Sequence, residues 1–297
     1  MADLIDPTIP ANAAFNRRVF VGLGAGAAAL GSTIAGALAQ ADGFGQPHAP
    51  IVAENDPAIV VARPPLVRPD ATIDSYAAWP VNFTPATPGL VLVQAIWGVD
   101  AQLRDTVRRY AKEGFICIAP ALFARQHPPS GDGVTDISLF RPLASALDTS
   151  QVKGDLLAGR DWIRTKAVAS RVGISGFCMG GGITIREIIG DSDYTAAVAF
   201  YGDVLQGGAR DATVTPDTFA YAKKITTPLM GNYGERDPSI RPADVRMMFA
   251  QLPVPHDAKI YPEAGHAFFD DTRASYVASA ASDAWTRTLG WLHRYLS

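Results

Sequence analysis

The stretch GISGFCMGGG at residues 173–182 constrains the fold more than any other part of the chain. The apolar run at 172–175 predicts a buried strand, and the glycines after it predict a sharp turn into a helix. Cys178 lies at the apex of this turn, with Gly176 two residues before it and Gly180 two residues after it. Glycine suits these positions because a Cβ there would collide with the strand or the helix. The N-terminus of the helix would point at the thiol and favour its thiolate form.

Two further motifs follow Cys178 in a chemically meaningful order. Asp237 follows a strand-like run at 227–230, and His266 follows another at 258–261. A G-x-C-x-G turn, then an acid, then a histidine is the order of the nucleophile elbow and its partners in α/β-hydrolases, with cysteine in place of serine. We therefore expect a Cys-Asp-His triad in loops at strand ends. Glu235 is a competing acid two residues from Asp237, and we expect it to face elsewhere.

Each of these residues also has a purely structural interpretation. A free cysteine is commonly an inert buried hydrophobe, an aspartate before proline commonly starts a turn, and a loop histidine is often a surface residue. The three signals in one order favour the catalytic interpretation for Cys178, Asp237 and His266. Cys117 is different, because it lies inside an apolar strand-like run at 115–119. We expect Cys117 to be a packed core thiol with no disulfide to Cys178.

The rest of the chain alternates apolar runs with helical patterns, which predicts parallel βαβ units with right-handed crossovers. Strands are expected at 73–79, 89–94, 115–119, 172–175, 195–201, 227–230 and 258–261, and helices at 102–112, 151–168, 242–252 and 274–295. The fold class is therefore α/β, an α/β-hydrolase fold with a mostly parallel central sheet and helices on both faces. The irregular connection at 120–148 is long, and we expect it to rim the active site.

The N-terminal 41 residues differ in character from the rest. Arg17 and Arg18 precede a run rich in Gly and Ala, and no charge occurs between Arg18 and Asp42. Small residues at 37–39 and 39–41 fit an A-x-A cleavage site. This pattern is similar to a twin-arginine export signal, which predicts a periplasmic or secreted protein; an uncleaved membrane anchor is the alternative. We expect a signal segment at 1–41, a linker or extended arm at 42–66, and the hydrolase domain at 67–297.

Composition excludes several classes of partner. The formal net charge is −3, so the chain has no basic surplus for nucleic acid. No H-E-x-x-H motif and no Cys/His cluster occurs, and we expect neither a metal nor a cofactor. The expected partners are a small-molecule substrate and, transiently, the twin-arginine export machinery. Nothing in the sequence decides the oligomeric state, although a monomer is favoured.

From about residue 88 to its end the chain resembles the dienelactone hydrolase family, the carboxymethylenebutenolidases. Four blocks carry the resemblance: QAIWGVD at 94–100, APALFAR at 119–125, GFCMGG at 176–181 and EAGHAF at 263–268. The resemblance implies the α/β-hydrolase fold and the same Cys-Asp-His triad.

The chain departs from the family pattern at two positions. Ala95 stands where the family has a glutamate that helps to activate the thiol, and Asp270 stands where it has an arginine for the substrate carboxylate. The nearest arginine downstream is Arg273, and Arg141 in the long connection has no secure counterpart. Without the glutamate, we expect the thiol to be activated by His266 and the helix N-terminus alone, as a resting Cys–His ion pair.

The expected reaction is hydrolysis of a lactone or small carboxylic ester through a thioester. The backbone N–H groups of Met179 and Ile96 are expected to form the oxyanion hole. An apolar pocket is expected from four aromatic residues, which have core packing as their alternative role: Trp97, Phe123, Tyr201 and Phe268. Cleavage of a thioester or amide, and a non-catalytic binding or redox-sensing module, are the alternatives to ester hydrolysis.

Overall fold

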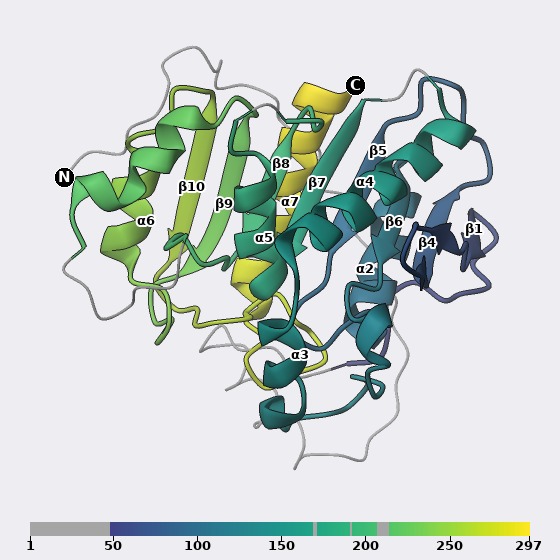
Figure 1. Ribbon diagram of the computed structural model, residues 1–297, viewed down its shortest axis with the longest axis horizontal. Coiled ribbons are helices and arrows are strands. Elements are labelled where there is room, and N and C mark those ends of the chain that lie inside the picture. The colour runs from purple at the N-terminus through teal and green to yellow at the C-terminus, as the bar shows by residue number, and fades with distance from the viewer. Residues whose placement is uncertain (1–47, 169–170, 191, 207–213) are drawn as a thin grey trace, which may run out of the picture.

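The computed structural model describes residues 48–168, 171–190, 192–206 and 214–297. An eight-stranded sheet runs through the molecule in the order β1-β4-β6-β5-β7-β8-β9-β10 (Figure 1). Its first two strands, β1 (Ile59–Ala62) and β4 (Ser75–Pro80), pair antiparallel. The other six pair parallel: β5 (Gly89–Val93), β6 (Ile116–Pro120), β7 (Val172–Phe177), β8 (Ala197–Phe200), β9 (Leu229–Gly234) and β10 (His256–Tyr261). A separate two-stranded sheet joins β2 (Leu66–Val67) to β3 (Thr72–Ile73).

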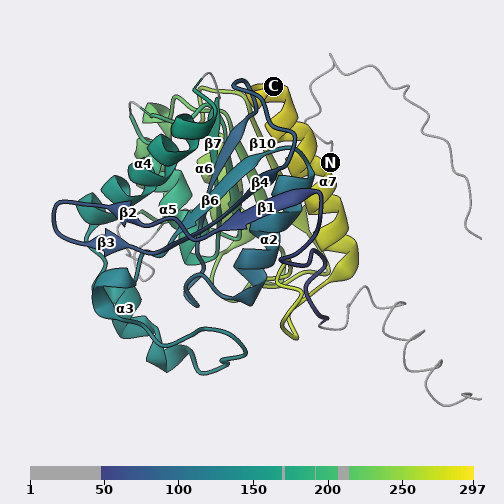
Figure 2. The same cartoon turned by 90° about the vertical axis from the view of Figure 1, so that its right-hand side faces the viewer.

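Helices cover both faces of the sheet, as expected for this fold class. Figure 2 shows α4, α5 and α6 on one face and α2 and α7 on the other. The α-helices are α2 (Ala101–Lys112), α3 (Arg141–Ser145), α4 (Thr149–Lys166), α5 (Met179–Glu187), α6 (Pro242–Phe249) and α7 (Ala278–Leu296). Short 3-10 segments are η1 (Ala124–Gln126), η2 (Ile137–Leu139) and η3 (Pro216–Lys224).

The central strands form the core, because both of their faces are covered. Every residue of β5, β6 and β7 is buried, which explains their continuous apolar runs. Cys117 lies in β6 and is buried, as expected, and burial raises the pKa of its thiol well above the ordinary value. Because β5, β7, β8, β9 and β10 are parallel, the loops after their carboxyl ends meet at one edge of the sheet.

The sheet begins earlier in the chain than the sequence indicated. Residues 59–62, inside the expected linker or arm at 42–66, form the edge strand β1 on β4. The Asp105 carboxylate accepts the backbone N–H groups of Ile51 and Val52 at 3.0 and 2.9 Å. These residues are therefore part of the folded domain. The connection at 120–148, expected to be irregular, also contains η1, η2 and α3.

Candidate active site

The turn around Cys178 is a tight strand-to-helix junction. Cys178 follows β7 and is the N-cap of α5, with φ 56° and ψ −117°, a backbone conformation that non-glycine residues rarely adopt. Its backbone N–H donates to the Phe200 carbonyl at 3.0 Å. A Cβ at Gly176 would collide with the Gly180 carbonyl, and one at Gly180 would collide with the Val93 carbonyl. The two glycines therefore let α5 approach the sheet closely enough to turn the thiol outward at its edge.

Side chains from three loops meet at this edge. His266 Nε2 lies 3.0 Å from Cys178 Sγ, and His266 Nδ1 lies 2.7 Å from Asp237 Oδ2. Asp237 is 8% exposed and its Oδ1 accepts the backbone N–H groups of Ser239 and Ile240 at 2.8 and 3.1 Å. Those two bonds fix the orientation of the carboxylate. Glu235 is exposed, so its side chain faces solvent as expected.

Two backbone bonds align the loop that carries Asp237 with the loop that carries His266. The N–H of Glu235 donates to Tyr261 at the end of β10, and that of Arg236 donates to the Ala264 carbonyl, both at 2.9 Å. The acid and the histidine therefore share one rigid frame at the ends of β9 and β10, while the cysteine belongs to β7.

The environment of His266 favours its protonated form. Burial lowers the pKa of the imidazole, but the hydrogen bonds to Asp237 and to Cys178 raise it by more, and the pKa rises from 6.5 to about 10. An imidazolium 3.0 Å from a sulfur is the arrangement expected of a Cys–His ion pair. Tyr201 packs beside the imidazole, with ring centroids 5.3 Å apart, and is itself buried.

A cavity of about 900 Å³ opens over Cys178 and His266. Ile96 and Met179, the expected oxyanion donors, both line it. Met179 is the first residue of α5, where helical N–H groups have no partner within the helix. Ile96 belongs to the turn after β5, which is closed by a 3.2 Å bond from the Gly98 N–H to the Ala95 carbonyl.

Two of the four aromatic residues expected in the pocket line this cavity, namely Trp97 and Tyr201. The other two do not: Phe123 is 1% exposed and Phe268 is 0% exposed, and neither reaches the cavity wall. Phe268 packs edge-on against Tyr201 with ring centroids 5.5 Å apart. It therefore supports the cavity wall from behind, through its contact with Tyr201.

Three arginines line the cavity, and the sequence patterns pointed to only two of them, Arg141 and Arg273. The sequence patterns did not reveal Arg186, which lies about two helical turns along α5 from its N-cap, Cys178. It is 34% exposed, and its Nε lies 3.7 Å from Glu187. Arg141, at the start of α3, is exposed and forms no ion pair with the described residues. Arg273 is the third.

Asp270 and Arg273 neutralise each other. Arg273 Nε donates to Asp270 Oδ2 at 2.9 Å, and the other carboxylate oxygen accepts from the Thr272 N–H and hydroxyl at 3.1 and 2.6 Å. The acid at the family's arginine position therefore carries its own cation. Asp100 is close by, and its pKa rises to about 7, chiefly because it is buried and also because Asp270 is near.

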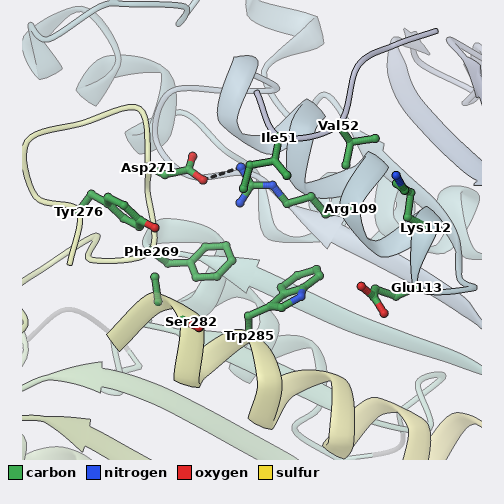
Figure 3. Close-up of a pocket in the computed structure, with 11 residues that line it drawn as sticks. Ile51, Val52, Arg109, Lys112, Glu113, Phe269, Asp271, Tyr276, Ser282 and Trp285 are labelled. Atoms are coloured by element: carbon green, nitrogen blue, oxygen red, sulfur yellow. Dashed lines mark hydrogen bonds and ion pairs between the residues drawn. The ribbon is translucent and has the colours of Figure 1, made fainter. Parts of the chain in front are cut away.

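A second cavity, of about 420 Å³, lies behind the loop that carries His266. Figure 3 shows Phe269 and Trp285 on its wall and the ion pair between Asp271 and Arg109 at its margin. It shares no lining residue with the cavity over Cys178. The loop therefore presents Asp270 to the first cavity and Asp271 to the second.

The described residues contain neither a metal site nor a membrane-spanning helix. Within 48–168, 171–190, 192–206 and 214–297, no group of three or more His, Cys, Asp or Glu side chains is placed to hold a metal ion. In the same ranges, every helix is too short or too polar to traverse a bilayer. The expected signal segment at 1–41 lies outside the described residues.

Comparison with known proteins shows the family to which the chain belongs. The model of the "Dienelactone hydrolase family" matches residues 73–296. A "Putative carboxymethylenebutenolidase" of Escherichia coli K12 is 33% identical over 267 residues, which cover 87% of this chain and 97% of that protein. A protein of the same name from Synechocystis is 36% identical, covering 72% of this chain and 89% of that protein. The crystal structure of a "Putative Dienelactone Hydrolase" from Klebsiella pneumoniae is 34% identical, with a TM-score of 0.71, and covers 80% of this chain and 100% of that one.

The match covers the sheet from β4 onward and every loop that contributes to the Cys178 cavity. The chain is an enzyme of the dienelactone hydrolase family, with that family's α/β-hydrolase fold.

Proposed function

We propose that this hydrolase cleaves a lactone or small carboxylic ester through a thioester on Cys178. The observation that carries the proposal is the contact chain from Cys178 Sγ to His266 Nε2, 3.0 Å, and from His266 Nδ1 to Asp237 Oδ2, 2.7 Å, at the floor of a cavity. An activated nucleophile needs a base within hydrogen-bond reach and a third group that orients the base.

Acylation begins with the Cys178 thiolate and the His266 imidazolium. The sulfur forms a bond to the ester carbonyl carbon, and the carbonyl electrons move to its oxygen. As the tetrahedral intermediate collapses, the C–O bond to the leaving group breaks and His266 gives its proton to the departing alkoxide. In a lactone the leaving alkoxide remains attached to the acyl chain.

Deacylation uses the same groups in the reverse protonation order. The neutral imidazole takes a proton from water, the hydroxide oxygen attacks the thioester carbon, and the sulfur leaves as the thiolate beside the restored imidazolium. Asp237 holds the imidazole with Nδ1 as a donor throughout and stabilises its charged form. In both steps the carbonyl oxygen becomes negative, and we assign its stabilisation to the N–H groups of Met179 and Ile96.

Hydrolysis of p-nitrophenyl acetate by the wild type, Cys178→Ala and Cys178→Ser tests the proposal. The wild type should show a burst of p-nitrophenolate equal to the enzyme concentration or steady turnover, and Cys178→Ala should show neither. Mass spectrometry of the quenched wild type should find one acetyl group on the peptide that contains residue 178. Equal rates for the wild type and Cys178→Ala would contradict the proposal and favour a binding module.

We also propose export through a twin-arginine signal at residues 1–41, with cleavage after residue 39 or 41. The supporting observations are Arg17 and Arg18 and the uncharged segment that follows them. The intact mass of the chain recovered from a periplasmic fraction tests this. A mass that still includes Met1 would favour the alternative of a membrane anchor, and recovery in the cytoplasm alone would contradict export.

A further inference from the structure

The loop that carries His266 and the turn that carries Ile96 meet at one side chain, Arg273. Its Nε donates to Asp270 at 2.9 Å within the histidine loop, and its Nη1 donates to the Val134 carbonyl in the long connection at 2.7 Å. Its Nη2 lies 3.8 Å from Asp100, the N-cap of α2. One guanidinium therefore joins three segments that are far apart in the sequence.

The same guanidinium lies over the ring of Trp97, the neighbour of Ile96. Its Cζ is 3.9 Å from the centre of the Trp97 ring, and the side chain is only 17% exposed. The indole also packs against Phe140 in an edge-on arrangement, with ring centroids 5.5 Å apart. A Cβ at Gly131 would collide with the Trp97 carbonyl. Trp97 therefore contacts both Phe140 and Arg273, and Trp97 and Arg273 together line the substrate cavity.

We propose that Arg273 is a positioning residue that holds the Ile96 N–H in place for the oxyanion. The inference rests on the proposed thioester mechanism. Ile96 and Trp97 belong to one short turn, so a displacement of the indole moves the peptide before it. A guanidinium suits this site, because it lies over the indole, donates to Asp270 and to the Val134 carbonyl, and faces Asp100. A lysine ammonium provides neither the plane nor the fork of donors.

The histidine loop does not depend on Arg273 in the same way. Asp271, the next residue after Asp270, pairs with Arg109 on the opposite side of the loop (Figure 3). The Val277 N–H donates to the Phe268 carbonyl at 3.0 Å, and the Ser275 hydroxyl donates to the Ala267 carbonyl at 3.2 Å. Loss of the Arg273 side chain should therefore loosen the Ile96 turn and leave the Cys178–His266 contact intact.

Two reactions of Cys178 distinguish a displaced oxyanion donor from a disrupted Cys178–His266 contact. Acylation by p-nitrophenyl acetate needs the oxyanion hole, whereas alkylation by iodoacetamide needs the thiolate but forms no oxyanion. For Arg273→Met we expect the acylation rate constant to fall roughly 10- to 100-fold, since a misplacement of about 1 Å costs on the order of 10²-fold. The alkylation rate constant and its pH profile should stay within about twofold of the wild type.

Arg273→Lys keeps the charge but not the planar fork. The fall in the logarithm of its acylation rate constant should be at least half of that for Arg273→Met. Arg273→Lys also carries the test if Arg273→Met does not fold, which circular dichroism would show. Arg287→Met is the matched control, because Arg287 also lies near two carboxylates, Asp257 and Asp283, but is outside the cavity. We expect its acylation rate to equal that of the wild type.

Acylation within twofold of the wild type for Arg273→Met and Arg273→Lys would overturn the inference. So would an equal fall in acylation and alkylation, because Arg273 would then act through the histidine loop or through general stability. If the wild type itself shows no acylation that depends on Cys178, the proposed function fails first, and that result is distinguishable from either of these.

Discussion

The substitution Asp237→Asn tests the role of the Asp237 carboxylate in orienting His266. Asp237 Oδ1 accepts two backbone N–H groups, from Ser239 and Ile240, and Oδ2 faces His266 Nδ1 at 2.7 Å. An asparagine has one oxygen, and the two backbone donors will claim it. Its NH₂ group must then face His266, so Nδ1 becomes the acceptor and the ring proton moves to Nε2. The neutral histidine can no longer take a proton from water.

The size of the effect follows from two contributions. A hydrogen bond to a charged group contributes about 1.5–3 kcal/mol, which at about 1.36 kcal/mol per tenfold corresponds to roughly a 10- to 160-fold loss. The wrong tautomer adds to this, and the equivalent change in a Ser-His-Asp triad lowers kcat about 10⁴-fold. We expect kcat for Asp237→Asn to fall on the order of 10²- to 10⁴-fold, because a cysteine is more nucleophilic than a serine and tolerates a weaker base.

The assay is steady-state hydrolysis of p-nitrophenyl acetate near pH 7.5, with the alkylation rate of Cys178 measured in parallel. Asp283→Asn is the control, since Asp283 bonds Lys259 and Tyr261 at 2.9 and 2.8 Å but does not line the cavity. Alkylation should slow in Asp237→Asn because the imidazolium that stabilises the thiolate loses its partner. A kcat within tenfold of the wild type would refute this account of Asp237.

Three further predictions concern stability, each measured by urea titration. Gly202→Ala should lower the free energy of unfolding by about 1–3 kcal/mol, because its Cβ would collide with the backbone of Gly181 in α5; an unchanged midpoint would contradict the close packing. The second prediction concerns His266, whose pKa rises from 6.5 to about 10 on folding. Protonated His266 therefore stabilises the fold fully below pH 6.5, and this contribution is lost as the pH rises to about 10. The stability difference between the wild type and His266→Gln should shrink over that interval, and a constant difference would count against it. Asp105→Asn should cost about 3–5 kcal/mol because the buried Arg108, the largely buried Arg109 and two backbone N–H groups lose their carboxylate. Asp56→Asn should change the free energy of unfolding little, because Asp56 pairs with an exposed lysine at the surface.

The turn around Cys178, the buried parallel strands and the sheet edge that carries the site could all be predicted from local sequence patterns. Gly176 is required by a collision with Gly180, four residues away, and the spacing of the two glycines around Cys178 predicted the turn correctly. The continuous apolar runs predicted the buried parallel strands, and their order predicted the fold. The strand ends also placed Asp237 and His266 near one sheet edge, because parallel strands share it.

The features that the sequence did not reveal depend on distant partners. β1 is four residues long and is a strand only because β4 lies beside it, so its Pro- and Ala-rich surroundings suggested a linker. In the sequence, an aromatic residue that lines the pocket cannot be distinguished from one that packs in the core. Phe268 packs in the core against Tyr201, and only the structure reveals this contact. Asp270 was recognised as a departure from the family pattern. Its ion pair with Arg273 could not be predicted, because it depends on the conformation of the loop between the two residues.

The anchoring of Ile51 and Val52 on Asp105 has a practical consequence for engineering the enzyme. The described chain starts beside α2, on the side opposite α3 in Figure 2. Arg141 of α3 lines the catalytic cavity and is exposed, so it marks the mouth of that cavity. A purification tag or surface tether joined ahead of residue 48 would therefore leave that mouth unobstructed, so the enzyme could be immobilised by this end without blocking diffusion of substrate.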